Sequence, residues 1–583
     1  MSLTIAHSGR RYPLKQLLTR AVAPIALLLF IAVPPPASAE TQKPTAAAIA
    51  TAHPIATAAG HEILAAGGNA FDAAVAVSAT LAVVEPMSSG LGGGGFWLLH
   101  RASDGFETMV DGRERAPLAA KRDMYLDKQG EVIPGLSMDG PLAAAIPGQP
   151  AALVHLAQRY GRLPLKKSLA PAIRVARDGF ETDEHYRNQA SFRLEVMRRN
   201  PETARLFLLN NDVPPVGHTI KQPELATTLE AIASHGRDGF YRGAVAKKLL
   251  TAVRGAGGIW SQRDFDSYQA VERAPIHGEY RGIRITSAAP PSSGGIALVT
   301  MLNILSGYDL EQMNELDRTH LIVEAMRRAY RDRAEYLGDP DFIKIPMAGL
   351  THPYYARTLR STIQPEHATP SQSLKGQKME EEGVDTTHFS ILDEEGNRVA
   401  ATLSINYPFG AAFVAPGTGV LLNDEMDDFS AKPGAPNAYG LVGAEANAIA
   451  PGKRPLSSMT PTFLESDERL AILGTPGGSR IITMVLLGAL EFAAGREPQE
   501  WVSRPRFHHQ FLPDLIQLEP DTFGDAIKQQ LIDRGHTLKI LENSYGNMQA
   551  ILWERSANRV TAASDPRGGG IAIVKQHQRP PQP

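Results

Sequence analysis

Thr386 stands where a threonine could act as a nucleophile. It begins a β-branched and aromatic stretch, 386–392, that is typical of a strand, and it follows a polar segment, 365–385, which we expect to be an exposed, poorly ordered linker. A threonine hydroxyl needs a base beside it, and the α-amino group of an N-terminal threonine, with a pKa of about 8, can be that base. This chemistry requires a cut between Asp385 and Thr386. The ordinary alternative is a threonine that simply packs in a sheet. Spacing alone does not make Thr386 catalytic.

A glycine-rich turn at 474–478 offers backbone groups that could stabilise a negative charge. The sequence predicts a strand over 470–473 and a helix over 479–494, so Gly477 and Gly478 precede a helix N-terminus. Free N–H groups and the helix dipole favour an anion there, and the pair could form an oxyanion hole. The loop lacks the Gly-Lys-Ser/Thr ending of a phosphate-binding loop. A purely structural turn is the alternative.

Other polar clusters could bind a substrate, but their spacing does not fit a metal or a dinucleotide. Arg113, within 111–115, could hold a carboxylate through two parallel hydrogen bonds, although such arginines are more often surface ion-pair partners. Adjacent carboxylates on an extended segment at 426–429 would point opposite ways, and the histidine pair at 508–509 lacks an H-E-x-x-H partner set. The glycine run at 90–95 follows a predicted helix and precedes a strand, the reverse of a dinucleotide site. We predict no metal.

The bulk composition is that of an ordinary globular protein. The chain has 583 residues, of which 43% are hydrophobic and 21% are charged, so it can bury one large core or two domains that share an interface. The net charge of −3, without a basic stripe, argues against nucleic acid as a partner. The chain has no cysteine, which excludes a thiolate nucleophile, thiolate metal ligands and disulfides.

Hydrophobic spacing predicts the elements that must position these groups. A turn-rich loop is expected at 290–295, and a turn that contains Gly396 should join two strands. The expected helices are 61–66, 70–84, 149–160, 169–177 and 319–337, and the expected strands are 96–100, 386–392 and 399–405.

The N-terminus has the features of a secretory signal peptide. Basic residues lie within 10–20, and the small residues at 37–39 fit a cleavage site. The apolar stretch at 22–33 is shorter than the ~20 residues that a membrane-spanning helix needs. We expect cleavage of 1–39 and a periplasmic or secreted mature protein without a stable membrane span.

Seven motifs in order resemble the γ-glutamyltranspeptidase family over nearly all of the mature chain. They are 111–114, 290–295, 385–388, 422–429, 453–459, 476–480 and 564–567. Each motif is weak alone, but the ordered set is highly specific. The resemblance implies an α+β fold, a four-layer αββα sandwich of the N-terminal-nucleophile hydrolase type, with no cofactor.

The same resemblance implies a precursor that cuts itself into a large chain, 40–385, and a small chain, 386–583. The two chains would stay together as a heterodimer that forms one domain. Thr386 would attack glutathione or another γ-glutamyl compound, form a γ-glutamyl ester, and pass the group to water or to an amino-acid or peptide amine.

Further site residues are implied by the matching positions. Gly477 and Gly478 would supply the oxyanion-hole amides. Ser404, where the family is expected to carry threonine, would hydrogen-bond the nucleophile with less rigidity. The implied substrate-binding residues are Arg113, Ser457 and Ser458 for the α-carboxylate and Asn406, Glu425 and Asp428 for the α-amino group. The segment 432–448 resembles a lid loop, in which Tyr439 would close the site by bonding Asn406.

Two alternatives remain open. A glutaryl-cephalosporin-type acylase shares the implied fold and maturation, but the complete amino-group set and the lid-like segment argue against it, because glutaryl substrates lack an α-amine. A non-catalytic periplasmic glutathione-binding relative is the alternative of another class. The retained threonine and glycine pair argue against that one.

Overall fold

The structure is a computed structural model that describes residues 42–577, except 375–385, 433, 435, 436, 438–440 and 442. Every described helix and strand lies in one compact unit that begins at Lys43, and the other unit, Met1–Gln42, is described only at Gln42. The expected signal peptide, 1–39, lies outside the described residues. No helix in the described part of the chain is long and apolar enough to cross a membrane.

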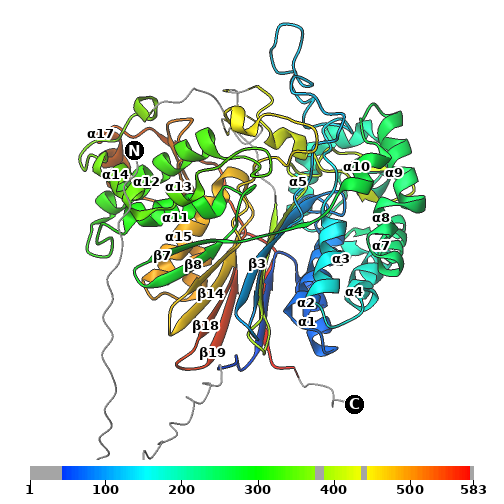
Figure 1. The fold of residues 1–583 in the computed structure, drawn as a ribbon, viewed down its shortest axis with the longest axis horizontal. Helices are drawn as coiled ribbons and strands as arrows, with labels where there is room; N and C mark the ends of the chain where they lie inside the picture. The colour runs from blue at the N-terminus through cyan, green and yellow to red at the C-terminus, as the bar shows by residue number, and fades with distance from the viewer. Residues whose placement is uncertain are drawn as a thin grey trace, which may run out of the picture. The chain divides into compact units, whose positions relative to one another are not determined.

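Two antiparallel sheets pack face to face at the centre of this unit (Figure 1). The larger sheet has the order β20-β1-β9-β10-β2-β3-β6 and the smaller one β19-β18-β14-β13-β8-β7. The strands of the larger sheet are β1 (Ala47–Thr51), β2 (Gly94–Arg101), β3 (Phe106–Asp111), β6 (Val271–Arg273), β9 (Thr387–Leu392), β10 (Arg398–Ser404) and β20 (Ile571–Lys575). Those of the smaller sheet are β7 (Ile276–Tyr280), β8 (Ile283–Ser287), β13 (Thr462–Glu465), β14 (Arg469–Gly474), β18 (Gln549–Glu554) and β19 (Arg559–Ser564).

Helices cover the outer face of each sheet (Figure 1). The larger sheet packs against α1 (Pro54–Ala65), α2 (Ala70–Val84) and α3 (Gln149–Arg159). Helix α4 (Leu165–Asp178) packs on α2, and α7 (Pro223–His235) packs on α4. The smaller sheet packs against α11 (Gly294–Leu305) and α15 (Ile481–Ala493), and α12 (Glu315–Tyr336) packs on α11. The expected four-layer αββα sandwich is therefore confirmed.

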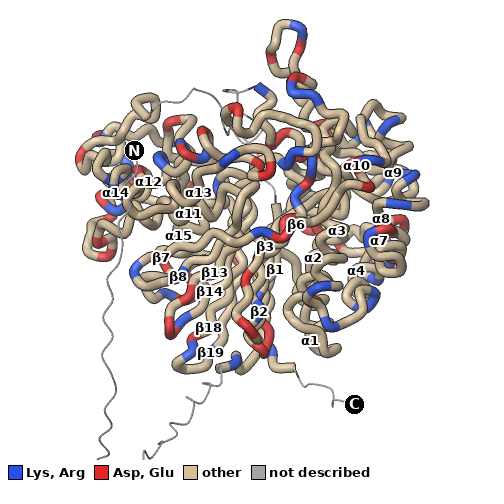
Figure 2. Tube along the Cα trace, viewed as in Figure 1, with Lys and Arg blue, Asp and Glu red and all other residues tan. Residues whose placement is uncertain are grey.

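The other described elements surround this frame. The remaining helices are α5 (Glu184–Arg199), α6 (Pro201–Phe207), α8 (Asp238–Tyr241), α9 (Gly243–Gly255), α10 (Gln262–Ser267), α13 (Met347–Leu350), α14 (Pro353–Ser361), α16 (Pro498–Ser503), α17 (Asp525–Asp533) and the short 3-10 turns η1 (Ser371–Leu374), η2 (Glu425–Asp428), η3 (Glu445–Asn447) and η4 (Gly478–Arg480). The remaining strands are β4 (Phe180–Glu181), β5 (Thr219–Ile220), β11 (Val414–Ala415), β12 (Val420–Leu421), β15 (Phe507–His508), β16 (Ile516–Leu518) and β17 (Leu538–Ile540). Figure 2 shows positive and negative residues interspersed along the described trace, as the small net charge suggests.

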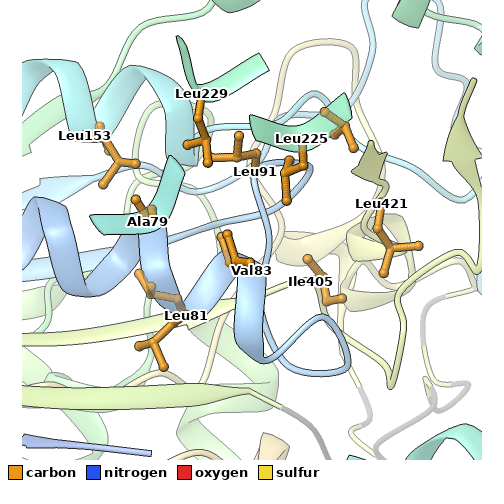
Figure 3. Close-up of a cluster of buried hydrophobic side chains, with 14 of the residues drawn as sticks. Ala79, Leu81, Val83, Leu91, Leu153, Leu225, Leu229, Ile405 and Leu421 are labelled. Carbon is orange, nitrogen blue, oxygen red and sulfur yellow. The ribbon is translucent and has the colours of Figure 1, made fainter. Parts of the chain in front are cut away.

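The core beside the larger sheet holds the end of β10 in place. Figure 3 shows side chains of α2, α3 and α7 gathered around Leu91, Ile405 and Leu421, which belong to one buried cluster. Ile405 is fully buried in this cluster and lies between Ser404 and Asn406 in the chain. The apolar packing of Ile405 thus fixes the positions of its polar neighbours Ser404 and Asn406.

Several sequence predictions need correction at the ends of elements. The helix expected over 61–66 is the longer α1, which starts at Pro54 because proline suits a first helical turn and His53 Nδ1 accepts the N–H of Ile55 at 3.2 Å. The carboxylates at 426–429 are not on an extended segment, because η2 runs through Glu425–Asp428.

The segment before the expected cut is also more ordered than its polar composition predicts. Ser371 is buried in η1, where its N–H donates to Asp514 and its Oγ accepts from Arg327, each at 2.7 Å. Most of 365–374 is exposed, as predicted, but Ser371 is buried, because its charged partners come from distant parts of the chain. Residues 375–385 lie outside the described range.

Candidate active site

Thr386 lies at the head of β9, between the strands β1 and β10 that flank β9 in the larger sheet. Its side chain is only 5% exposed. The Thr386 Oγ1 lies 3.5 Å from the Oγ of Ser404, the last residue of β10, which is a long hydrogen bond. The Ser404 Oγ accepts the N–H of Asn406 at 2.8 Å, so its own proton is available to Thr386.

The glycine run before β2 allows this arrangement by letting backbones approach closely. A Cβ added at Gly93 would lie 2.1 Å from the Ser404 carbonyl oxygen, and one added at Gly92 would lie 2.0 Å from that of Leu421. No side chain fits at such distances. The run at 90–95 is therefore a close-packed bend against the end of β10, as its position before a strand predicts.

The second predicted glycine motif forms a turn between β14 and α15. Gly477 has φ 135° and Gly478 has φ 54°, both in the left-handed region that favours glycine. Gly478 and Ser479 line the same cavity as Thr386. The Tyr330 hydroxyl on α12 donates to the Ser479 carbonyl and ties this turn to the helical layer.

Substitution of Gly478 by alanine is expected to lower kcat by about 10²-fold, because a Cβ at positive φ would displace the N–H group that is predicted to stabilise the oxyanion. Gly495→Ala is the matched control, since Gly495 has φ 80° in the turn after α15 and its Cβ would meet only Arg469, at 3.9 Å. Steady-state kinetics and thermal unfolding of both variants provide the measurement. Equal kcat losses in the two variants would contradict an oxyanion role for Gly478.

The charged part of the site centres on Arg113, which follows β3 and is 1% exposed. Its guanidinium contacts the carboxylates of Glu425 and Asp428, lies 3.7 Å from the Glu114 carboxylate, and donates to the Pro455 carbonyl at 3.2 Å. Burial by itself would lower the pKa of Arg113, but Glu425 and Asp428 raise it, so the guanidinium stays charged.

The acids around Arg113 outnumber it, and burial changes their ionisation. Burial raises the pKa of Glu425 to about 7; Arg113 opposes the shift and Asp428 adds to it. Burial and then Glu425 raise the pKa of Glu114 well above its usual value. In the described structure, Oε2 of Glu425 and both carboxylate oxygens of Glu114 have no hydrogen-bond partner. Glu425 therefore has an acceptor available inside the site.

The serine pair, Ser457 and Ser458, is held in place by the turn-rich loop at 290–295. Ser457 donates its N–H to the Pro291 carbonyl at 2.9 Å and accepts the N–H of Ser293 at its own carbonyl, at 2.8 Å. The Ser457 Oγ accepts the N–H of Met459 at 3.1 Å. Two motifs that lie far apart in the sequence thus form one bridge beside the cavity.

Asn406 and the lid-like segment complete the wall of the site. Asn406 has φ 75° and donates from Nδ2 to the Asp424 carbonyl at 3.1 Å. Asn437 donates from Nδ2 to Asp428 at 3.2 Å, and Leu441 lines the cavity. Tyr439 lies outside the described residues, so its contact with Asn406 stays a prediction.

One cavity brings nearly all the predicted residues together. It is lined by Arg113, Thr386, Ser404, Asn406, Glu425, Asp428, Ser457, Ser458 and Gly478. Gly477 lies next to this lining but is not part of it. The lining also includes Leu441, Met459, Ser479 and Ile481, for which the sequence predicted no role in the site, although all but Ile481 lie in segments that its motifs singled out.

A second cavity, of about 1300 Å³, reaches Thr386 and was not anticipated from the sequence. Its lining includes His53, Glu85 and Arg480. Glu85 accepts the Thr387 hydroxyl at 2.6 Å, and burial raises its pKa to about 7. Thr386 therefore lines two cavities, a small charged one and a large one.

Two face-to-face antiparallel sheets between helical layers, with a buried threonine at the head of an inner strand, define the class of N-terminal-nucleophile hydrolases. Comparison with known proteins places the chain within this class. The family model described as gamma-glutamyltranspeptidase matches residues 56–574. The chain belongs to the γ-glutamyltranspeptidase family.

Individual relatives agree with this placement. The glutathione hydrolase proenzyme of Pseudomonas sp. strain A14 is 45% identical over 484 residues, which cover 81% of this chain and 84% of the relative. The solved cephalosporin acylase from Bacillus halodurans has a TM-score of 0.79 at 27% identity, covering 94% of this chain and 99% of its own. The solved Helicobacter pylori gamma-glutamyltranspeptidase has a TM-score of 0.54 at 39% identity, covering 55% of this chain and 92% of its own.

Proposed function

We propose that this chain is the precursor of a glutathione hydrolase and γ-glutamyltransferase that uses Thr386 as its nucleophile. The observation that carries the proposal is the single cavity that joins a buried threonine hydroxyl to a guanidinium and to carboxylates. A γ-glutamyl group carries one carboxylate and one ammonium on the same carbon, so it needs one cation and at least one anion at a fixed separation.

The proposed roles follow from the charges in the cavity. The substrate α-carboxylate takes the guanidinium of Arg113, and the α-ammonium takes Glu425 and Asp428, with Asn406 beside them. Arg113 already contacts both acids, so the two charges of the substrate insert into an existing ion pair and each buried charge keeps a partner. The hydroxyls of Ser457 and Ser458 donate to the same carboxylate.

The reaction proceeds in two stages. In the precursor, the Thr386 hydroxyl attacks the Asp385 carbonyl carbon, and hydrolysis of the resulting ester frees the α-amine. In the mature enzyme, this amine takes the hydroxyl proton while the oxygen attacks the γ-amide carbon; the leaving amine receives the proton and a γ-glutamyl ester remains. Water completes hydrolysis, and an amino-acid or peptide amine completes transfer. Gly477 and Gly478 donate N–H groups to the oxyanion, and Ser404 orients the hydroxyl.

Two findings support processing into a large chain, 40–385, and a small chain, 386–583, and we propose that the two chains then remain together as a heterodimer. The Pseudomonas relative is named a proenzyme. The Helicobacter pylori chain matches over 92% of its own length but over only 55% of this chain, as expected for a solved chain of about the size of the large one. Intact mass under denaturing conditions tests the cut directly.

A cephalosporin-type acylase is the second candidate, because an acylase structure shares this fold over nearly the whole chain. The two activities separate on substrates that differ only by the α-amino group. We expect γ-glutamyl p-nitroanilide to be turned over at a higher kcat/KM than glutaryl p-nitroanilide, since Glu425 and Asp428 are available to an ammonium. The reverse order would favour the acylase.

The KM for γ-glutamyl donors is expected to rise as the pH falls below about 7. The pKa of Glu425 is about 7, so below that pH the carboxylate is increasingly protonated and loses its attraction for the ammonium. Arg113, Asp427 and Asp428 also act on the pKa of Glu425, and Glu425→Gln should flatten the profile. KM measured between about pH 5.5 and 8.5 checks this; a flat wild-type profile would contradict the role.

We further propose that the mature enzyme is periplasmic or secreted. The basic, apolar and small-residue segments within 1–39 support this. N-terminal sequencing of the large chain from an exported fraction should begin at Glu40. An intact N-terminus in a cell-retained fraction would contradict it.

A further inference from the structure

The last turn of α12 carries a guanidinium that is buried directly behind the serine pair. Arg333 is 5% exposed; its Nε donates to the Ser293 Oγ at 3.0 Å and its Nη2 donates to the Ser458 Oγ at 3.1 Å. Both partners are neutral hydroxyls. Within the described part of the chain, no carboxylate lies within 4.0 Å of Arg333.

Several buried arginines of this protein have carboxylate partners. Arg113 contacts Glu425 and Asp428, and Arg328 contacts Glu324. A buried cation without a counterion is costly, and a protein retains one mainly where a ligand supplies the missing charge. Burial lowers the pKa of Arg333, while Tyr330 and Asp428 raise it. Arg333 is therefore a buried cation next to the site whose hydrogen-bond partners among the described residues are hydroxyls and not carboxylates.

The hydroxyl that Arg333 contacts is oriented for a ligand. A serine hydroxyl has one proton, and the Ser458 Oγ already accepts from Arg333. No acceptor for that proton lies within hydrogen-bond distance among the described residues, and Ser458 lines the small cavity. The Ser458 proton is therefore available to an acceptor in the cavity.

The charges around Arg113 show why a second cation is needed. The guanidinium of Arg113 is shared between the carboxylates of Glu425 and Asp428, so this cluster has little positive charge left to attract an anion. A substrate carboxylate that binds there lies close to two acidic side chains as well as to one guanidinium. A second buried positive charge on the other side of the serine pair would restore the attraction.

We propose that Arg333 is a positioning residue for the α-carboxylate of the γ-glutamyl donor. It holds the Ser458 hydroxyl so that the proton faces the carboxylate, and it adds a positive charge behind that hydroxyl. This inference rests on the proposed function and extends it to how the anionic end of the donor is recognised. Arg333 acts through Ser458 and does not touch the reacting amide.

The test compares three p-nitroanilide donors on the purified, processed protein. The γ-glutamyl donor has both charges, the glutaryl donor keeps the carboxylate without the amine, and the 4-aminobutanoyl donor keeps the amine without the carboxylate. For Arg333→Gln, we expect KM to rise about tenfold or more with the two carboxylate-bearing donors and kcat to change by less than about threefold. With the 4-aminobutanoyl donor, kcat/KM should change by less than about twofold. An equal loss with all three donors would mean that Arg333 is only structural and would overturn the proposal.

Arg331→Gln is the matched control, because it is the same substitution two positions earlier on α12. Arg331 bonds Asp332 and Tyr355 rather than the serine pair, and it does not line the cavity. This variant should leave the pattern across the three donors unchanged. A pattern like that of Arg333→Gln would show that the helix, and not the Arg333 contact, causes the effect.

A double-mutant cycle tests whether Arg333 acts through Ser458. The KM increases of Arg333→Gln and Ser458→Ala should fall well short of multiplying in the double variant, because both remove the same hydrogen bond. Fully multiplicative effects would overturn the coupling.

If Arg333→Gln does not fold, Ser293→Ala removes the other hydroxyl partner of Arg333. This variant should show a smaller KM increase, again confined to carboxylate-bearing donors. A wild-type protein that turns over no γ-glutamyl donor would refute the proposed function instead, whereas the donor comparison concerns Arg333 alone.

Discussion

Replacement of Thr386 by alanine is expected to give one uncut chain without measurable γ-glutamyl turnover, a loss of at least about 10³-fold. The reason is that one hydroxyl is needed both to break the bond after Asp385 and to form the γ-glutamyl ester. Wild-type protein should give two chains, the smaller beginning at Thr386. Intact mass under denaturing conditions and a p-nitroanilide assay on the same samples make the measurement.

Two control variants show whether the hydroxyl at this position is responsible. Thr386→Ser keeps a hydroxyl and should still be cut. Thr387→Ala makes the same substitution one position later, where the hydroxyl contacts Glu85 and is not part of the small cavity, and it should also yield two chains. An uncut wild-type protein would contradict the enzyme proposal and would favour a relative that binds without catalysis.

Replacement of Arg113 by lysine is expected to raise the KM for γ-glutamyl donors by about 10- to 100-fold, with a much smaller effect on self-cleavage. Lysine keeps the charge but not the planar fork that bonds a carboxylate while holding Glu425, Asp428 and the Pro455 carbonyl. Steady-state kinetics and the rate at which the precursor disappears should be measured on the same preparation.

The control for this substitution lies two residues away. Arg115 bonds the Ser267 carbonyl at 3.2 Å and does not line the cavity, so Arg115→Lys should leave the KM within about twofold of wild type. If Arg113→Lys slowed self-cleavage as much as it weakened donor binding, the residue would support the whole site instead of recognising the α-carboxylate.

Much of the site could be predicted from the sequence where local chemistry decides it. Thr386 heads a strand after a polar segment, and the helix expected over 70–84 is α2. Gly477 and Gly478 adopt backbone angles that other residues rarely adopt, so their position between a strand and a helix identifies the turn. The ordered motifs also led to the correct family. These features depend on side chains and backbone angles within a few residues of one another.

Only the tertiary structure decided how these parts combine. Arg113, Ser404, Glu425, Ser457 and Gly478 come from different elements and loops, and the fold of the chain brings them to one cavity. The ion pairs of Arg113 with two acids, the raised pKa of Glu425 and the ordering of Ser371 by Asp514 all depend on such long-range contacts. Arg333 is the clearest case of a residue that the sequence does not reveal. It lies on a regular helix outside the motifs, and only its contact with the serine pair connects it to the site. Local spacing determines the chemistry available to each residue, while burial and neighbours, which only the folded chain brings together, determine how that chemistry is used.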